Sequence, residues 1–290
     1  MKVLSYAVAL LFAFYILNPV VIGQDKDHKV DKEKLKAYKE HKVKAFCSGD
    51  NWNGDNKVSV KDLREMTVAA TGNLTVDGGR NGGVSVKGEN RSDVLVRACV
   101  QAWGSSDAEA KSLLSNIRID TGAVVKAESS SEENWSVSYE VLVPRNTNLN
   151  LTAHNGGISI KSVDGNLEFA TTNGGVNLSD LSGAVKGRTT NGGVNVSLTG
   201  NTWRGSGLDV TTTNGGVNLH VPTGYAAQFE TGTTNGGFKS DVAELTVQTE
   251  DDKGGWQRSK RVVASMNGGG APIKVVTTNG GIRIGSNENE

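Results

Sequence analysis

Carboxylates recur at regular intervals in the second half of this 290-residue chain, and glycoside hydrolysis requires paired carboxylates. Glu168, Asp209 and Glu230 occupy the same repeat position as Lys186 and Lys274, which is typical of an alternating charge ladder on a solvated face. We therefore expect no catalytic residue, and a carbohydrate-active enzyme is the alternative. The remaining acids of this part are Asp164, Asp180, Asp241 and Glu244.

Residues 51–62 form a second candidate site, because their side-chain oxygens have the spacing of a calcium loop. The segment resembles the calcium loop of dockerin modules, but Asn51 replaces the usual Asp and Asn56 stands where glycine is needed. Only one copy is present, so a polar β-turn loop is the favoured interpretation and we expect no metal site. The ligands would be Asn51, Asn53, Asp55, Ser59 and Asp62.

Other chemistry finds little support in the sequence. His154 and His220 lie far apart in the repeat and have no serine or cysteine partner, so we expect a surface role for both. The repeats lack the Gly-Gly-x-Gly-x-Asp pattern of calcium-loaded β-rolls, and the chain has neither a P-loop nor a dinucleotide fingerprint. We expect no cofactor.

Whether the two cysteines, Cys47 and Cys99, form a disulfide depends on the compartment of the protein. Residues 1–23 have the pattern of a secretory signal peptide, with Lys2 before an apolar run that Pro19 ends; an uncleaved anchor is the alternative. In an oxidising compartment the cysteines form a disulfide most simply, closing a loop worth ~4 kcal/mol. Two separate buried thiols are the alternative.

Overall charge sets few limits on partners. Lysine and arginine number 31 and so do the acids, so the net charge of +0 would not draw the chain to nucleic acid or to an anionic membrane. Residues 24–45 are charged with mixed sign and predict a solvated linker. We expect an exported protein of the periplasm, the outer surface or the medium.

The elements that must position these side chains are repeats of Thr-Thr-Asn-Gly-Gly. Apolar residues stand six before and three after each Asn with polar residues between them, which predicts strands on both sides of a tight turn. Asn-Gly tolerates the positive backbone angles of such a turn. The Asn residues of these corners are Asn155, Asn173, Asn191, Asn214, Asn235 and Asn279.

Two architectures satisfy this pattern. In a β-solenoid each repeat is one rung, and identical side chains stack about 4.8 Å apart. In a hairpin array each Asn-Gly joins two antiparallel strands. We favour the solenoid, because stacked ladders of Asn and Thr require near-identical neighbours. Residues 200–207 and 251–270 are interpreted as excursions between repeats.

The residues before the repeats predict a mostly β region with one helix. Residues 93–103 and 135–143 alternate cleanly as strands, and Ser106 and Glu109 form a capping box for a helix that ends near Asn116. Short strands are expected from 65 to 87, with a degenerate corner at Asn81. The predicted organisation is therefore a β region at 46–147 followed by repeats at 148–286.

The corners, the β region and the capped helix together resemble the bacterial putative adhesin family of β-strand-repeat proteins, a domain of unknown function. The resemblance covers most of residues 46–284 and is strongest in the recurring Thr-Thr-Asn-Gly-Gly-Val-Asn-Leu. It implies an exported β-solenoid at the cell envelope and brings no catalytic residues. We expect adhesin-like binding to a glycan or an envelope protein, with a periplasmic scaffold as the alternative.

Overall fold

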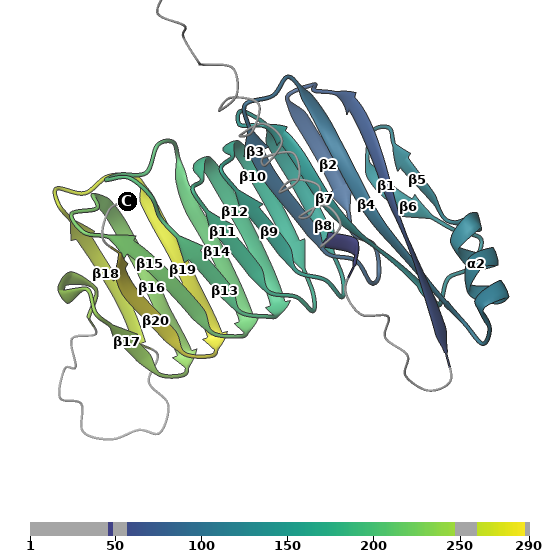
Figure 1. Cartoon of the computed structure of the whole chain (residues 1–290). Coiled ribbons are helices and arrows are strands. Elements are labelled where there is room, and N and C mark those ends of the chain that lie inside the picture. Colours follow the sequence, from purple (N-terminus) through teal and green to yellow (C-terminus); the bar gives the residue numbers. More distant parts are fainter. Residues whose placement is uncertain (1–45, 49–56, 247–259, 288–290) are drawn as a thin grey trace, which may run out of the picture. The chain divides into compact units, whose positions relative to one another are not determined.

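The alternating segments form two ten-stranded sheets, and in each of them most strands pair with a neighbour from another repeat (Figure 1). The structure, a computed structural model, describes residues 46–48, 57–246 and 260–287. The predicted signal peptide and linker lie outside the described residues. The chain divides into Met1–Ala45 and Phe46–Glu290, and the described residues belong to the second unit.

Sheet A contains the strands that follow each corner. Its order is β1 (Val58–Ala69), β4 (Asp93–Gly104), β7 (Trp135–Pro144), β3 (Val84–Glu89), β9 (Ile158–Lys161), β11 (Val176–Ser179), β13 (Val194–Ser197), β15 (Val217–Pro222), β20 (Ile282–Asn287) and β17 (Phe238–Ser240).

Sheet B contains the strands that precede each corner. Its order is β18 (Lys260–Met266), β16 (Ala227–Asn235), β19 (Pro272–Asn279), β14 (Gly207–Asn214), β12 (Ser182–Asn191), β10 (Asp164–Thr171), β8 (Asn148–Ala153), β2 (Asn73–Asp77), β6 (Val125–Glu128) and β5 (Arg118–Thr121). Both sheets run without interruption past residue 147, since β3 pairs with β9 and β2 pairs with β8.

The strands on either side of a corner lie in different sheets and do not form hairpins. Equivalent strands of neighbouring repeats pair in parallel, with Leu167 opposite Val185 in sheet B and Val176 opposite Val194 in sheet A. The hairpin alternative is therefore wrong. The fold is mainly β and solenoid-like.

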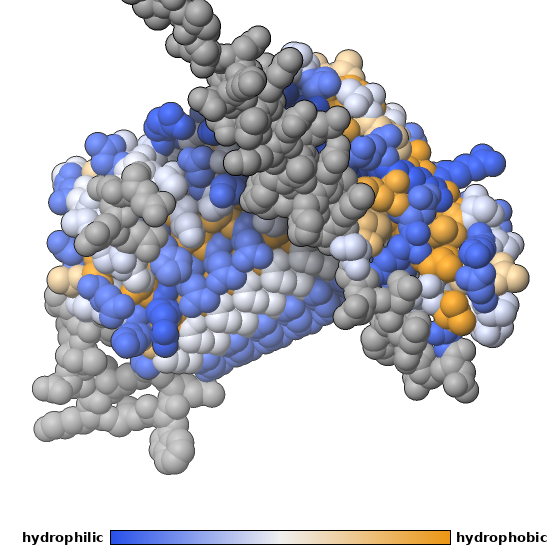
Figure 2. All heavy atoms as spheres, in the orientation of Figure 1, coloured by the Kyte–Doolittle hydropathy of each residue, from blue (hydrophilic) through white to orange (hydrophobic). Residues whose placement is uncertain are grey.

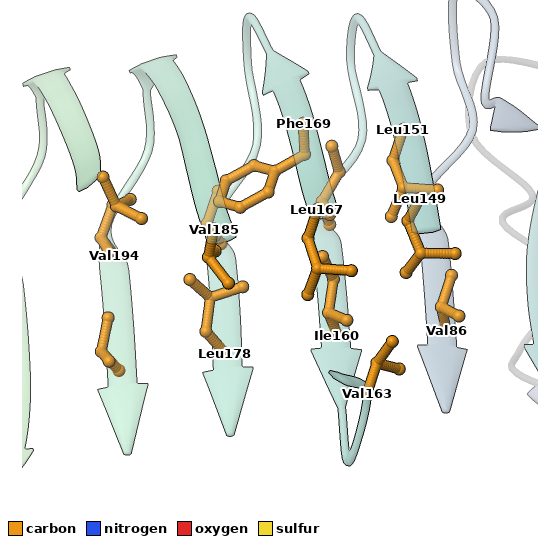
Figure 3. Packing of buried hydrophobic residues seen from close by; sticks show 14 of the residues in the cluster. Val86, Leu149, Leu151, Ile160, Val163, Leu167, Phe169, Leu178, Val185 and Val194 are labelled. Atoms are coloured by element: carbon orange, nitrogen blue, oxygen red, sulfur yellow. The ribbon is translucent and has the colours of Figure 1, made fainter. Parts of the chain in front are cut away.

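The core lies between the two sheets and consists of the apolar columns that flank the corners (Figure 3). The column six residues before each Asn is buried throughout, and so is the column three residues after it except at Phe238, which is half-buried. Phe169 lies over Gly187 on the next strand, where a Cβ would come within 2.1 Å of the ring. The missing side chain thus makes room for the aromatic ring. The first column is Leu149, Leu167, Val185, Leu208, Phe229 and Ile273.

The rungs do not stack in sequence order. Strand β19 lies between β14 and β16, and β20 lies between β15 and β17, so the corner of Asn279 sits between those of Asn214 and Asn235. The chain returns to this gap through β18, which pairs antiparallel with β16 at the sheet edge. The interpretation of 251–270 as an excursion is therefore wrong for 260–266.

The predicted helix is confirmed as α2 (Asp107–Asn116). The Ser106 side chain accepts a hydrogen bond from the backbone N–H of Glu109, and the Glu109 carboxylate accepts one from the backbone N–H of Ser105. At the other end, the Arg64 guanidinium of β1 donates to the backbone carbonyls of Leu114 and Ile117. These bonds satisfy groups that a helix terminus leaves unpaired, and they hold α2 against the edge of sheet A.

Two buried tyrosines predict that the fold loses stability at alkaline pH. The Tyr139 hydroxyl lies in the core with no hydrogen-bond partner among the described residues, and burial raises its pKa. Burial likewise raises the pKa of Tyr225 to about 12. Unfolded tyrosine ionises near pH 10. Above pH 10 the tyrosines therefore ionise in the unfolded chain before they ionise in the folded protein. The free energy of unfolding is unaffected by them below pH 10 and falls as the pH rises toward the folded-state pKa values.

We expect Tyr139→Phe to be about 1 kcal/mol more stable than wild type at pH 8, because it removes an unpaired buried hydroxyl. The advantage should grow at pH 11, where the wild type loses stability. Urea unfolding at both pH values measures this. Tyr225→Phe is the control and should reduce only the alkaline loss. A less stable Tyr139→Phe at pH 8 would contradict the assignment of an unpaired hydroxyl.

Candidate binding face

The corner asparagines form a continuous ladder along the stack. The Asn173 side-chain N–H donates to Oδ1 of Asn155 at 2.8 Å, and the same bond recurs between successive corners up to Asn235, which donates to Asn279 at 2.7 Å. Asn81 accepts from Asn155 at the other end, so the degenerate corner belongs to the ladder. Since each amide is used by its neighbours, these residues hold the stack together. The intervening bonds join Asn191 to Asn173, Asn214 to Asn191 and Asn279 to Asn214.

The corner glycines are required by close backbone approach rather than by positive backbone angles. Non-glycine residues with positive φ are Asn134, Ser162, Asp180 and Asn267, and the corner Asn-Gly-Gly residues are absent from the described positions with positive φ. A Cβ on Gly192 would instead lie 2.0 Å from the carbonyl oxygen of Gly174 in the preceding corner. The turn explanation from the sequence is therefore wrong.

The two threonines of each corner have different roles. The first is buried, and the Thr189 hydroxyl donates to the carbonyl oxygen of Gly174 at 2.8 Å. Thr212, Thr277 and Thr233 repeat this bond on their own neighbours. The second threonine of this corner, Thr190, is exposed. In this Thr-Thr pair the first hydroxyl thus bonds to the neighbouring corner, and the second faces outward.

The outward face of sheet B brings the predicted column of charges into one row. We call Glu168, Lys186, Asp209, Lys274 and Glu230 the charge row, in their order across β10, β12, β14, β19 and β16. Because β19 lies between β14 and β16, the signs alternate without a break. Lys274 Nζ lies 3.6 Å from Asp209 Oδ2, and Arg261 lies 3.1 Å from Glu230.

Mostly small residues on both sides make the charge row a ridge between two grooves. One groove, of about 430 Å³, lies along Thr152, Ala170 and Thr211, with Arg188 between the last two. The other, of about 490 Å³, lies along Ala184, Gly207 and Pro272. These grooves were not predicted from the sequence, although small residues at equivalent repeat positions are a visible signal. Stripes of like hydropathy along the stack are visible in Figure 2.

The carboxylates of the charge row are separated by cations. Glu168 and Asp209 stand two strands apart with Lys186 between them, a strand separation of about 9.6 Å. Retaining glycosidases hold their carboxyl groups at about 5–5.5 Å and inverting enzymes at about 6.5–9.5 Å. The strand separation therefore exceeds the retaining spacing and lies at the upper limit of the inverting range.

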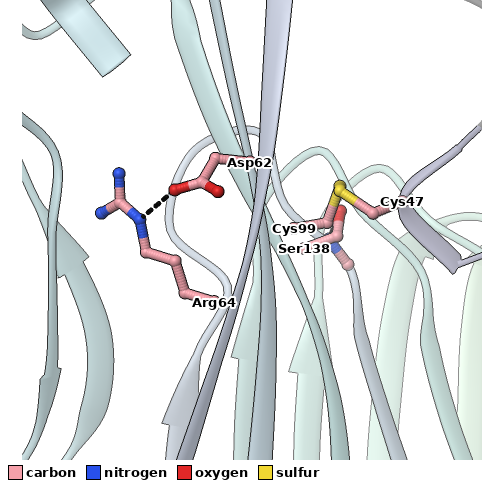
Figure 4. Close-up of a disulfide and its surroundings, with 6 residues drawn as sticks. Cys47, Asp62, Arg64, Cys99 and Ser138 are labelled. Atoms are coloured by element: carbon pink, nitrogen blue, oxygen red, sulfur yellow. Dashed lines mark hydrogen bonds and ion pairs between the residues drawn. A yellow bond between two sulfur atoms is a disulfide. The ribbon is translucent and has the colours of Figure 1, made fainter. Parts of the chain in front are cut away.

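The outward face of sheet A carries the disulfide. Cys47 and Cys99 are joined, with Cα atoms 5.3 Å apart, and Ser138 lies close to the bridge (Figure 4). The bridge ties the residues before β1 to the middle of β4. Beside it, Arg97 makes ion pairs with Glu65 at 2.6 Å and with Glu140 at 2.8 Å. Burial lowers the pKa of Arg97, but these carboxylates offset that effect and raise it overall.

The remaining predicted site residues are dispersed. His154 is exposed in a corner, and His220 lies on β15 of sheet A opposite Ser197. Of the candidate calcium ligands, Asn51, Asn53 and Asp55 lie outside the described residues. Ser59 and Asp62 are in β1, where the Asp62 carboxylate accepts a hydrogen bond from Arg64 at 2.8 Å. The structure brings none of these described side chains to the charge row.

Solved structures of similar extent align with the chain at low identity. A putative cell adhesion protein from Clostridium sporogenes ATCC 15579 is 9% identical, over 78% of this chain and 100% of that chain, with a TM-score of 0.41. A putative adhesin from Bacteroides fragilis NCTC 9343 is 10% identical, over 79% and 97%, with a TM-score of 0.29. A putative lipid binding protein from Parabacteroides distasonis ATCC 8503 is 11% identical, over 77% and 96%, with a TM-score of 0.30.

Family membership rests on the sequence. No curated protein matches the chain significantly. Among the described residues, no helix has the length and apolar character of a membrane span. The family model described as Toastrack DUF4097 matches residues 34–285, which include both sheets and the predicted repeats. This chain belongs to the Toastrack DUF4097 family.

Proposed function

We propose that this protein is an exported, non-enzymatic protein of the cell envelope or surface that binds a partner through the outward face of sheet B. The observation that carries the proposal is the charge row, a rigid ridge of alternating charges between two grooves. Rigid placement on neighbouring strands lowers the entropy cost of engaging a partner. The alternation of cations with the carboxylates supports binding, because each carboxylate has a lysine on the neighbouring strand.

The disulfide supports export, because disulfides persist in oxidising compartments. The export proposal includes two locations, the cell surface and the periplasm, and they differ in whether the protein can act in adhesion. Only a displayed protein can act as an adhesin.

A periplasmic scaffold is the second candidate. It is favoured by the corner ladder, whose amides bond to one another and leave little for a ligand. It is also favoured by the pairing of Lys274 with Asp209 within the charge row. On this view the polar rows serve to keep the stack soluble.

Protease shaving of intact cells, followed by detection of the repeat region, tests the proposal. Cleavage on intact cells is the expected result for an adhesin and makes adhesion assays with the purified protein worthwhile. Repeats that survive until the outer barrier is opened would remove the adhesin proposal in favour of the scaffold. Repeats found only in the cytoplasm would remove both.

A further inference from the structure

We propose that the outward face of sheet B binds a second copy of this chain, with the two charge rows facing each other about a two-fold axis between β12 and β14. The inference rests on the proposed function for the location of the binding face, and it adds the identity of the partner. A homodimer of this kind is isologous, so one surface patch must complement itself.

Eight adjacent strands of sheet B, from β2 to β18, extend the charge row on both sides. Thr75 and Asn150 precede Glu168, and Val263 follows Glu230. The middle of these eight strands lies between Lys186 of β12 and Asp209 of β14. A two-fold axis parallel to the strands at this point gives two copies their greatest overlap.

This axis pairs opposite charges at four of the five positions of the charge row, and the fifth, Glu230, comes opposite the uncharged Asn150. It places Lys186 of one copy opposite Asp209 of the other, and Glu168 opposite Lys274, and each pair occurs twice. Moving the axis by half a strand spacing, onto β12 or β14, places each charge of that row opposite a like charge or an uncharged residue. The alternating order therefore excludes axes that lie on a strand, and among the axes between strands this one gives the greatest overlap.

The two neighbouring rows agree with the same axis. In the row along the 430 Å³ groove, Asp77 of β2 comes opposite Arg261 of β18, and Arg188 comes opposite Thr211. In the other row Ala184 comes opposite Gly207, so no bulk blocks approach at the centre. The axis therefore creates no contact between like charges across the three rows.

Spacing favours a second copy over an extended peptide. The charge row repeats at the strand spacing of about 4.8 Å, whereas side chains on one side of a β-strand repeat at about 6.6–6.8 Å. A peptide lying along the row would lose register within two strands, but a second stack keeps it throughout. Glu168 and Lys186 make no ion pair within the described part of the chain, so both charges are available to a partner.

The size of the face predicts a weak and reversible dimer. Eight strands and five residues along each strand cover roughly 650 Å² per copy, below the roughly 800 Å² of a standard interface. The contacts are largely ionic, and exposed ion pairs contribute little each and are screened by salt. The dimer should therefore depend on concentration and on ionic strength.

Analytical ultracentrifugation of the protein purified from cells that produce it tests the proposal. We expect a monomer–dimer equilibrium that weakens at least about tenfold between ~20 mM and ~500 mM salt. Lys186→Glu and Asp209→Lys should each weaken dimerisation by about 100-fold. The double variant K186E/D209K should recover it to within about tenfold of wild type, because the central pair is reversed and its complementarity kept.

Lys161→Glu is the matched control, because it makes the same charge change at an exposed position on the outward face of sheet A. It should dimerise like the wild type, and thermal melts establish that each variant is folded. A wild type that stays monomeric at ~1 mM in low salt overturns the proposal. So does a double variant as weak as the singles, or a Lys161→Glu that fails to dimerise.

The outcomes also separate this inference from the proposed function. If a monomeric wild type is retained on cells or on an envelope fraction and Lys186→Glu is not, the face binds a different partner. The homodimer is then wrong and the proposed function stands. A dimer that responds to the variants as expected, in a protein that shaving does not reach, supports the inference and removes surface adhesion.

Discussion

Gly192→Ala is expected to lower the thermal midpoint of unfolding by about 10 °C. The new Cβ would lie 2.0 Å from the carbonyl oxygen of Gly174 and 2.5 Å from its carbonyl carbon, so only a shift of the backbone can relieve the clash. That backbone is held on its other side by the Asn155 corner. Overpacking typically costs about 1–3 kcal/mol, and a clash with backbone atoms places this variant at the upper end of that range.

Gly193→Ala is the matched control, because it makes the same change one residue later in the same corner. Its Cβ would meet the Gly216 carbonyl oxygen at 3.4 Å, an ordinary contact, and we expect a midpoint within about 2 °C of wild type. Thermal melts followed by circular dichroism compare the two. Equal losses in both variants would show that the corners need glycine for its backbone freedom and not for close stacking.

Removal of the Cys47–Cys99 bridge is expected to cost about 4 kcal/mol, the chain-entropy value for a loop of 52 residues. The cost has a structural counterpart. Strand β1 is at the edge of sheet A and pairs only with β4 among the described strands, and the bridge fastens the residues before it. Without the bridge, the unfolded chain gains conformations and the edge strand loses an anchor.

Urea unfolding of a Cys47→Ser, Cys99→Ser double variant measures this cost. Wild type in a strong reductant is the control and should unfold at the same urea concentration as the double variant. Both should lie well below the oxidised wild type. An unchanged midpoint in the double variant would show that the bridge is either not formed in the purified protein or not needed to hold β1.

The inward columns, the capped helix and the long strands were predictable, because each depends on residues close in sequence. Ser106 with Glu109 is a local signal, and the helix begins and ends where it predicts. The alternation around Asn173 or Asn191 also sets which side chains face inward. Such patterns specify the environment of a residue without specifying which strand lies beside it.

Rung order was not predictable, and the reason is the similarity of the corners themselves. The corner of Asn279 can stack on that of Asn214 because the two present the same glycines, threonine and amide as any other pair. The sequence interval between them carries no information on this choice. Strand β18 was missed because it has no corner and because its outward face carries the apolar Val263, which breaks the alternation around Val262 and Met266.

The charge row was predictable as a set of residues but not as an ordered row. In sequence order Glu230 follows Asp209, which places two acids side by side. Strand β19 separates them with Lys274, so the strict alternation of signs depends on the chain topology. The grooves likewise require the sheet register, since no single repeat contains both of their walls.

The position of β19 and β20 also determines how the chain can be completed. In an ordinary repeat array each new unit is added to the end of the one before it, and stability accumulates unit by unit. Here β19 and β20, which follow β16 and β17 in the chain, are placed inside the array. Strands β16 and β17 have no partner on their inner side until residues 272–287 have been made.

As a result, the rungs at the far end of the stack depend on one another. Losing β19 would separate β16 from β14, so the end cannot fray one rung at a time from the C-terminus. Because synthesis proceeds from the N-terminus, these pairings wait until residues 272–287 have been made. A chain cut before Pro272 therefore lacks the inner neighbours of β16 and β17, which makes residues 272–287 a condition for a finished array.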